Sequence, residues 1–174
     1  MTAADHNGSL SGRAIIHAIK AAGVEYVVSV PDIVTSDGLL WPISRDADLT
    51  HIRVCKEDEG VSICTALAYC GKRALLLIQN TGFLDSINAI RAIAVEYDNP
   101  LCMMIGLQGK EPDVLPIQSD KVSVRIVEPM LDVMGIAYHL LQTTANTDAI
   151  APAIEAAYRD DHPVCFVIGR SPSE

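Results

Sequence analysis

Apolar positions along the chain follow two alternating spacings, one typical of helices and one typical of buried strands. The first helical segment spans residues 9–24, where apolar side chains recur every three or four positions, a serine stands at the expected N-cap and Gly23 marks the end. A short apolar run, residues 25–31, follows and ends in proline, which predicts a buried strand. This exchange of helix and strand continues to the end of the chain.

The same two spacings predict the remaining elements. Further helices are expected over residues 33–44, 57–70, 83–97, 130–135 and 147–160. Further strands are expected over residues 50–55, 73–79, 101–107, 137–142 and 163–169. The stretch from Gln108 to Glu128 is expected to be irregular, and a connection of that length is often a functional loop.

The expected strands are continuous apolar runs, which sets them apart from half-exposed strands of alternating polarity. Continuous runs are typical of a mainly parallel sheet that is covered by helices on both faces. We therefore predict an α/β fold of three layers with a mainly parallel six-stranded sheet, and residues 1–174 as a single domain.

Composition narrows the class of protein. Hydrophobic residues make up 49% of the chain, so it is expected to fold, and a net charge of -9 without a basic cluster argues against nucleic-acid binding. No apolar run has the length of a membrane span, and the N-terminus lacks the pattern of a secretion signal.

Five scattered cysteines without a C-x-x-C motif are expected to be free, mostly buried thiols. We expect a cytoplasmic protein.

Polar residues follow the first four expected strands, where parallel sheets bind their ligands. Each patch also has a plain structural interpretation. Glu57, Asp58 and Glu59 suit the first turn of a helix, and Asp32 suits an N-cap. The Gln79–Gly82 turn lacks a phosphate-loop pattern, and no histidine has a serine or cysteine beside it in a nucleophile motif. Spacing alone leaves these choices open.

Four short motifs, taken together and in order, resemble one known family. They are Val-Pro-Asp at 30–32, Lys-Glu-Asp-Glu-Gly at 56–60, the run from Gly71 to Gly82, and Ser-Ile-Asn-Ala-Ile at 86–90. The chain resembles the pyrimidine-binding (PYR) domain of thiamine diphosphate-dependent decarboxylases. Within them it looks like the family of sulfopyruvate decarboxylase alpha subunits and the matching half of phosphonopyruvate decarboxylases. The resemblance extends from the first helix to the last strand and implies the thiamine diphosphate-binding fold.

The resemblance assigns roles to several side chains. In the family, one glutamate at a helix start hydrogen-bonds N1′ of the aminopyrimidine and favours the imino form that deprotonates the thiazolium. A partly desolvated carboxylate shares its proton well with a ring nitrogen. Because the family's acid usually precedes a small residue, the resemblance places this role on Glu59, before Gly60, and makes Glu57 the less favoured choice.

The remaining assignments concern the pocket around the cofactor. The resemblance implies that Gln79, Asn80, Thr81 and Gly82 line the pyrimidine and substrate side. Asp32 stands where related enzymes often keep an acid that shuttles a proton or contacts the substrate. The implied reaction is decarboxylation of a 2-oxo acid with release of an aldehyde, and the cofactor supplies most of that chemistry.

Two departures from the family pattern shape the expected assembly. No Gly-Asp-Gly motif is present, although the family needs one, on a second (PP) domain, to hold magnesium and the diphosphate. The resemblance therefore implies a separate beta subunit that supplies magnesium, in a hetero-oligomer, with a homodimer or larger assembly as the alternative for the chain alone. Leu107 and Gln108 also stand where several relatives carry histidine, which leaves the proton donor open.

The expected substrate is a small anionic 2-oxo acid with a sulfonate or phosphonate tail. Lys72, Arg73, Lys110 or basic groups of the beta subunit are the candidate partners of that tail. A carboligating relative with the same cofactor is one alternative, and a non-catalytic PYR-like binding module is another. The sulfonate substrate, sulfopyruvate, is the leading expectation.

Overall fold

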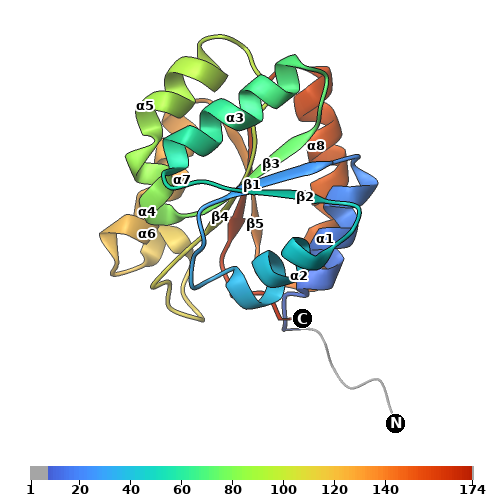
Figure 1. Ribbon diagram of the computed structural model, residues 1–174. Helices are drawn as coiled ribbons and strands as arrows, with labels where there is room; N and C mark the ends of the chain where they lie inside the picture. Colours follow the sequence, from blue (N-terminus) through green and yellow to red (C-terminus); the bar gives the residue numbers. More distant parts are fainter. Residues whose placement is uncertain (1–7, 174) are drawn as a thin grey trace.

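A computed structural model describes residues 8–173 and contains a central six-stranded sheet in which all paired strands are parallel (Figure 1). The strand order is β2-β1-β3-β4-β6-β5. The strands are β1 Tyr26–Ser29, β2 Thr50–Arg53, β3 Ala74–Gln79, β4 Cys102–Gly106, β5 Ala137–Leu141 and β6 Val164–Ile168. The prediction of a parallel six-stranded sheet is confirmed.

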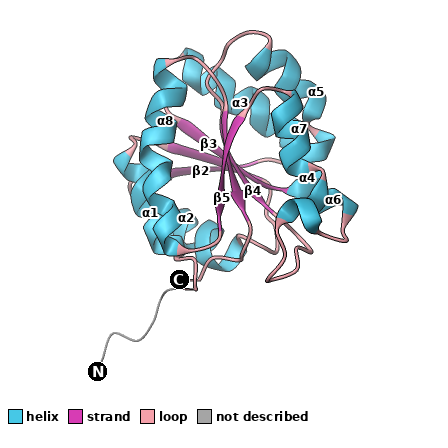
Figure 2. Ribbon diagram, turned by 180° about the vertical axis from the view of Figure 1, so that it is seen from behind, coloured by secondary structure: helices cyan, strands magenta, loops and turns pink. Residues whose placement is uncertain are grey.

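Helices cover both faces of the sheet, as Figure 2 shows. One face carries α1 (Gly12–Ala21), α2 (Trp41–Arg45) and α8 (Ile150–Arg159), and the other carries α3 (Glu57–Tyr69), α4 (Asn80–Asp85), α5 (Ile87–Ala89), α6 (Val122–Arg125) and α7 (Val127–Val133). Shorter turns complete the fold: π-helices Ser36–Leu40 and Ile90–Val95, and 3₁₀-helices Pro116–Gln118 and Thr144–Ala149. The arrangement confirms the predicted three layers.

The hydrophobic core has two halves, one on each side of the sheet. Leu75 and Leu77 of β3 pack into the half under α1 and α8, while Leu76 and Ile78 pack into the half under α3 and α7. All four side chains are at most 1% exposed. Because successive strand residues point to opposite faces, a strand buried on both sides must be apolar at every position. This explains the continuous runs in the sequence.

Two helix predictions need correction. The helix expected over residues 83–97 begins three residues earlier, at Asn80, and is interrupted at Ser86. The stretch expected to be irregular contains α6 and the start of α7. Val124, Val127 and Leu131 are fully buried there, at a spacing of three and four residues that is itself helical. Neighbouring prolines had obscured this short amphipathic pattern.

The local signals at helix ends are confirmed. The Ser11 hydroxyl accepts a hydrogen bond from the Ala14 N–H at 3.3 Å and so caps α1, and Gly23 adopts a positive φ of 74° after it. The cysteines are free, but only three of the five are buried, since Cys55 and Cys70 are exposed. Within residues 8–173, no helix combines the length and hydropathy that crossing a membrane requires.

Candidate active site

The carboxyl ends of the parallel strands meet at one edge of the sheet, and the candidate residues follow these ends. Because β2 lies on one side of β1 and β3 on the other, the chain changes direction between β1 and β3. Crevices at such switch points are the usual ligand sites of open α/β sheets. At this edge, the segments that follow β1, β2 and β3 are the Val30–Asp32 loop, the start of α3 and the start of α4.

Glu57, the first residue of α3, lies directly against Gly82 in α4. A Cβ atom added to Gly82 would overlap Cγ, Cδ and Oε1 of Glu57, so in this conformation the carboxylate occupies the space that a side chain at residue 82 would need. Glu57 is half-buried, whereas Gly82 is buried. The structure thus brings one acid of the Glu57–Glu59 cluster onto the Gln79–Gly82 turn, and that acid is Glu57.

Glu59 points to a different partner. Its Oε2 accepts hydrogen bonds from the backbone N–H groups of Cys55 at 3.1 Å and Lys56 at 3.3 Å, and the residue is exposed. This is the reciprocal contact by which a glutamate at the third helical position satisfies the backbone before the helix. The contact gives Glu59 a structural role at the start of α3.

Helix geometry separates the two glutamates. Successive helical residues are rotated by about 100°, so side chains two positions apart point to nearly opposite sides. Glu57 stands three and four residues before Gly60 and Val61, which are buried against the sheet, and therefore lies on the same face. That spacing is a signal in the sequence that favours Glu57 over Glu59.

Asp32 is buried, and its carboxylate is fully engaged by its own loop. Oδ1 accepts from the N–H groups of Val34 at 2.6 Å and Thr35 at 2.9 Å, and Oδ2 accepts from the Thr35 hydroxyl at 2.5 Å. These bonds fix the loop after β1 in the manner of an N-cap. The capping interpretation of Asp32 therefore has direct support.

The turn after β3 divides into structural and accessible residues. Asn80 is completely buried, its amide donates to the Ser123 carbonyl at 3.1 Å, and its oxygen accepts from the Gln108 N–H at 3.1 Å. Asn80 therefore ties the start of α4 to the loop after β4. Gln79 is half-buried, Thr81 is exposed, and the two side chains bond to each other at 2.5 Å.

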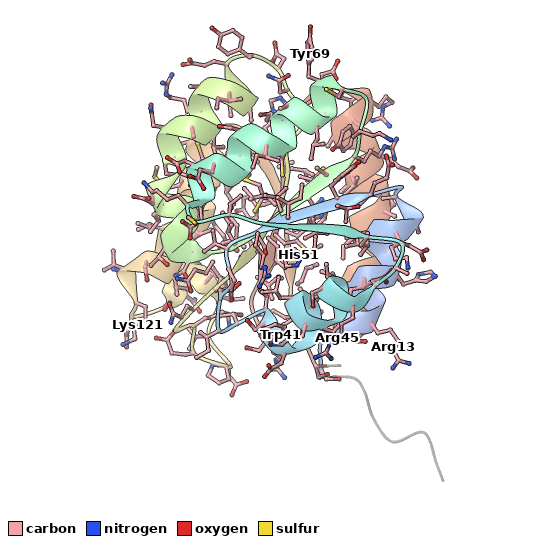
Figure 3. All side chains as sticks on the ribbon, in the orientation of Figure 1. Arg13, Trp41, Arg45, His51, Tyr69 and Lys121 are labelled. Carbon is pink, nitrogen blue, oxygen red and sulfur yellow. The ribbon has the colours of Figure 1, made fainter. Side chains whose placement is uncertain are left out.

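A serine–histidine contact was not visible in the sequence. The Ser29 hydroxyl lies 2.8 Å from Nε2 of His51 on the neighbouring strand β2 (His51 is labelled in Figure 3). Ser29 is completely buried, so a substrate does not reach it. Burial, with a smaller contribution from the Arg53 charge, lowers the pKa of His51. The Ser29–His51 pair is therefore a structural hydrogen bond between two neighbouring strands.

A cavity of about 420 Å³ opens at the ends of β4 and β6, next to the β1 loop. Its walls include Ile33, Leu107 and Gly169, and two basic side chains, Lys110 and Arg170, border it. Lys110 was among the candidate partners of the anionic substrate tail that were predicted from the sequence, but Arg170 was missed. Both follow buried strands at the carboxyl edge, which is the signal that would have paired them.

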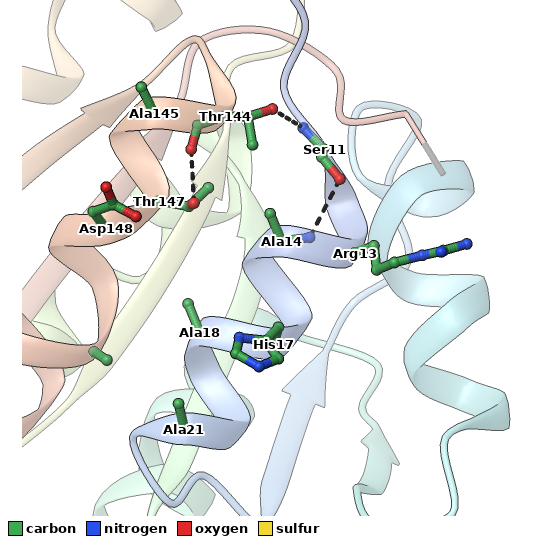
Figure 4. Close-up of a pocket in the computed structure, with 11 residues that line it drawn as sticks. Ser11, Arg13, Ala14, His17, Ala18, Ala21, Thr144, Ala145, Thr147 and Asp148 are labelled. Atoms are coloured by element: carbon green, nitrogen blue, oxygen red, sulfur yellow. Dashed lines mark hydrogen bonds between the residues drawn. The ribbon is translucent and has the colours of Figure 1, made fainter. Parts of the chain in front are cut away.

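A larger groove, about 760 Å³ in volume, lies elsewhere, between α1 and the segment 144–151 (Figure 4). Five of its lining residues are alanines. At one end the Thr144 hydroxyl accepts from the Ser11 N–H at 3.0 Å, and the Thr147 hydroxyl donates to the Thr144 carbonyl at 2.7 Å. The groove shares none of its lining residues with the switch point between β1 and β3.

No family model matches the chain. A curated relative from Methanococcus maripaludis, "Sulfopyruvate decarboxylase subunit alpha", is 29% identical over 164 residues, which cover 91% of this chain and 93% of the relative. A relative from Methanosarcina acetivorans, "Sulfopyruvate decarboxylase", is 24% identical over 151 residues. That match covers 86% of this chain but 37% of the longer relative. The resemblance inferred from the four motifs is confirmed.

A solved structure shares the fold. It is the 2-oxoglutarate:ferredoxin oxidoreductase from Magnetococcus marinus with 2-oxoglutarate, coenzyme A and succinyl-CoA bound. The TM-score is 0.65 at 13% identity, and the match covers 92% of this chain and 29% of that chain. The shared fold and the parallel six-stranded sheet confirm the predicted α/β fold class.

Proposed function

We propose that this chain is the alpha subunit of a two-subunit, thiamine diphosphate-dependent decarboxylase that converts sulfopyruvate to sulfoacetaldehyde and carbon dioxide. The observation that carries the proposal is the match, over nearly the whole length of both chains, to a protein named as that subunit. The position of Glu57 at the switch point of the sheet supports it independently.

The pyrimidine half of thiamine diphosphate suits the residues at this edge. Gly82 leaves room for the Glu57 carboxylate against the turn, and Gln79 and Thr81 present an amide and a hydroxyl beside it. A carboxylate with adjacent uncharged hydrogen-bonding groups is a fitting donor set for an aminopyrimidine ring. When bound, the cofactor supplies the electron sink that lets the carboxylate of a 2-oxo acid leave as carbon dioxide.

Two glutamates compete for the contact with the pyrimidine N1′. The family pattern favoured Glu59, and that role stays a prediction. The geometry supports Glu57 instead, because Glu57 lies on the α4 turn while the Glu59 carboxylate already accepts two backbone hydrogen bonds. In this arrangement Glu57 would share a proton with the ring of a bound cofactor, and Glu59 holds the start of α3 in position.

The roles of Asp32 and Asn80 follow from their bonds. Asp32 holds the β1 loop through three hydrogen bonds and is better suited to positioning the wall of the site than to moving a proton. Asn80 positions the loop after β4 in the same way. Catalysis by Asp32 stays a prediction.

We infer that the diphosphate and magnesium are held by a separate beta subunit. Within the part of the chain that the structure describes, no group of three or more acidic, histidine or cysteine side chains is arranged to bind a metal. The name of the Methanococcus relative specifies a subunit, and the Methanosarcina relative, whose name specifies none, is much longer than this chain. Both facts support an enzyme in which this chain is one of two parts.

The test is reconstitution of the enzyme from two chains. The full chain is mixed with a candidate beta subunit that carries a Gly-Asp-Gly motif, thiamine diphosphate and magnesium, and release of carbon dioxide from sulfopyruvate is measured. Phosphonopyruvate in parallel separates the phosphonate alternative, and product analysis separates carboligation from aldehyde release. Absence of turnover with either acid, although the two chains form a complex, would overturn the proposal.

Two substitutions identify the acid in the same assay. Glu57→Gln keeps the side-chain volume but removes the shared proton, and we expect a loss of turnover of at least about 100-fold. Glu59→Gln retains an oxygen that accepts the backbone hydrogen bonds, so we expect turnover within about threefold of the unsubstituted chain. If Glu59→Gln loses turnover and Glu57→Gln does not, Glu59 is the acid that contacts the pyrimidine N1′.

A further inference from the structure

The cavity at the ends of β4 and β6 has the size of a small-molecule site and is built from three separate loops. Its volume, about 420 Å³, falls in the range of small-ligand pockets. The loops are Ile33–Val34 after β1, Leu107–Pro112 after β4 and Gly169–Ser171 after β6. All three leave the carboxyl edge of the sheet, where Glu57 also lies.

The walls of the cavity are held in place by bonds already described. Asp32 fixes Val34 and Thr35, and Asn80 fixes the backbone of Gln108. An added Cβ on Gly106 would lie 3.0 Å from Val34, so the β1 loop packs tightly onto the end of β4. The Leu107 N–H donates to the carbonyl at the end of β6 at 3.1 Å. The cavity is therefore largely pre-formed, which reduces the entropy lost on binding.

Two cations meet at this cavity without a carboxylate partner. Within residues 8–173, neither Lys110 nor Arg170 lies within ion-pair distance of an acidic side chain. Lys110 Nζ donates to the Glu111 carbonyl at 2.9 Å, and the Arg170 guanidinium donates to the Gly8 carbonyl. Both contacts use neutral backbone acceptors, so neither of them is an ion pair.

The electrostatics of Lys110 are consistent with an anion site. Burial and then the nearby Arg170 charge lower the pKa of Lys110, while Glu111 and Asp113 act in the opposite direction from a distance. A second positive charge close enough to affect Lys110 disfavours its charged form, although the chain as a whole carries a net charge of -9. A bound anion between the two cations would remove that repulsion.

We propose that this cavity binds a tetrahedral oxyanion, and that in the enzyme it holds the sulfonate end of the substrate through Lys110 and Arg170. The identity of the substrate rests on the proposed function, but the anion site does not. A guanidinium offers paired N–H donors that match two oxygens of a sulfonate or phosphonate, and an ammonium adds a compact charge for the third. Asn80 and Gln108 link the cavity to the turn on which Glu57 lies.

The first experiment measures anion binding by the full chain alone. Calorimetric titration uses methanesulfonate, inorganic sulfate and inorganic phosphate, at an ionic strength held constant with chloride. We expect saturable binding, weakened about tenfold or more in Lys110→Gln and in Arg170→Gln, since each variant removes one charge-assisted contact. Lys72→Gln is the matched control. The structure removes this sequence candidate from the site, because Lys72 precedes the amino end of β3, does not line the cavity and is paired with Glu25 at 3.0 Å.

The second experiment uses the reconstituted two-chain enzyme and separates KM from kcat. We expect Lys110→Gln and Arg170→Gln to raise the KM for sulfopyruvate about tenfold, with a smaller change in kcat and no change in turnover of pyruvate, which has no anionic tail. Parallel assays with phosphonopyruvate show which tail the site prefers. Lys72→Gln is expected to leave all of these values unchanged.

The outcomes distinguish the two proposals. If the unsubstituted chain binds the anion and both variants lose that binding, the anion site is supported. If the two-chain enzyme then turns over no 2-oxo acid, the proposed function is overturned while the site stands. Turnover of sulfopyruvate with KM values unaltered by either substitution keeps the function and overturns the sulfonate site. The sulfonate site is also overturned if none of the three anions binds more strongly than chloride. The same holds if the anions bind equally well to the unsubstituted chain and to the two variants.

Discussion

The two sides of the carboxyl edge use their charged residues in different ways. On the side of β1, β2 and β3, the carboxylates of Asp32 and Glu59 accept backbone hydrogen bonds within their own segments. On the side of β4 and β6, Lys110 and Arg170 reach one cavity from loops that are 60 residues apart in sequence and have no carboxylate partner within residues 8–173.

This difference shows how charge alone misleads. The acidic cluster stands out in the sequence, yet much of it stabilises local backbone, as charged residues at helix starts commonly do. The basic pair is inconspicuous in the sequence and becomes a site only when the sheet brings two distant loops together. Glu57 is the exception on the acidic side, because its contact with Gly82 is tertiary.

The largest effect is expected for Gly82→Ala, which would push Glu57 away from the α4 turn. Alanine normally stabilises a helix relative to glycine by about 1 kcal/mol, so the fold tolerates the change. A displacement of a reacting group by about 1 Å can cost about 100-fold, and we expect a loss of turnover of that order in the two-chain enzyme.

Stability measured by urea unfolding tests whether the contact is responsible. In a Glu57→Ala background the clash is gone, and Gly82→Ala is expected to stabilise the chain. In the unsubstituted background the same change is expected to be less favourable by about 1 kcal/mol. Equal effects of Gly82→Ala in both backgrounds would mean that residues 57 and 82 do not interact.

The next effect concerns the bridge between the two sides of the edge. Asn80→Ala leaves the Gln108 N–H and the Ser123 carbonyl without their buried partner, and we expect the free energy of unfolding to fall by about 2 kcal/mol. Asn88→Ala is the control, since Asn88 is exposed and, within residues 8–173, its side chain bonds only to Arg91. Urea unfolding of both variants measures the difference, and similar midpoints would contradict the bridging role.

A smaller effect is expected at the helix cap. Glu59→Ala removes the acceptor for two backbone N–H groups and is expected to lower the free energy of unfolding by about 1 kcal/mol. Glu59→Gln keeps an acceptor and is expected to be close to neutral. Thermal unfolding separates the two variants, and a Glu59→Ala chain as stable as the unsubstituted one would rule out the cap.

The smallest effect concerns the pH dependence of the basic side. The pKa of Lys110 in the folded state lies below its unfolded value of about 10.5. The charged form of Lys110 therefore lowers the stability of the folded chain at any pH below the folded-state pKa. This penalty disappears as the pH rises from the folded-state pKa to the unfolded value. Lys110→Gln is therefore expected to be slightly more stable at pH 7 without anions, with the gain shrinking toward pH 10.5. Thermal unfolding at several pH values measures it. A gain independent of pH would exclude this cause.

Much of the fold could be predicted from the chain because its signals are local. The buried strands are continuous apolar runs, and Ser11 and Gly23 mark the ends of α1. Residues 122–128 were wrongly expected to be irregular because neighbouring prolines outweighed the helical spacing of Val124, Val127 and Leu131. The interruption at Ser86 has no comparable sequence signal.

The candidate site was only partly predictable. The four motifs led to the family resemblance, and the periodicity of α3 already places Glu57 on the face of Gly60 and Val61. A preference for the acid next to a glycine favoured Glu59 instead. The pairing of Lys110 with Arg170 needed the strand order, since β4 and β6 are neighbours in the sheet but not in the chain.

The alternation of helix and strand, the two-sided burial of the sheet and the caps of its helices can all be derived from the amino-acid order, because each depends on residues within a few positions of one another. The contact between Glu57 and Gly82 and the cavity shared by Lys110 and Arg170 arise only when the chain is folded. Those contacts join segments that are distant in sequence, and they depend on how helices and loops pack around the sheet.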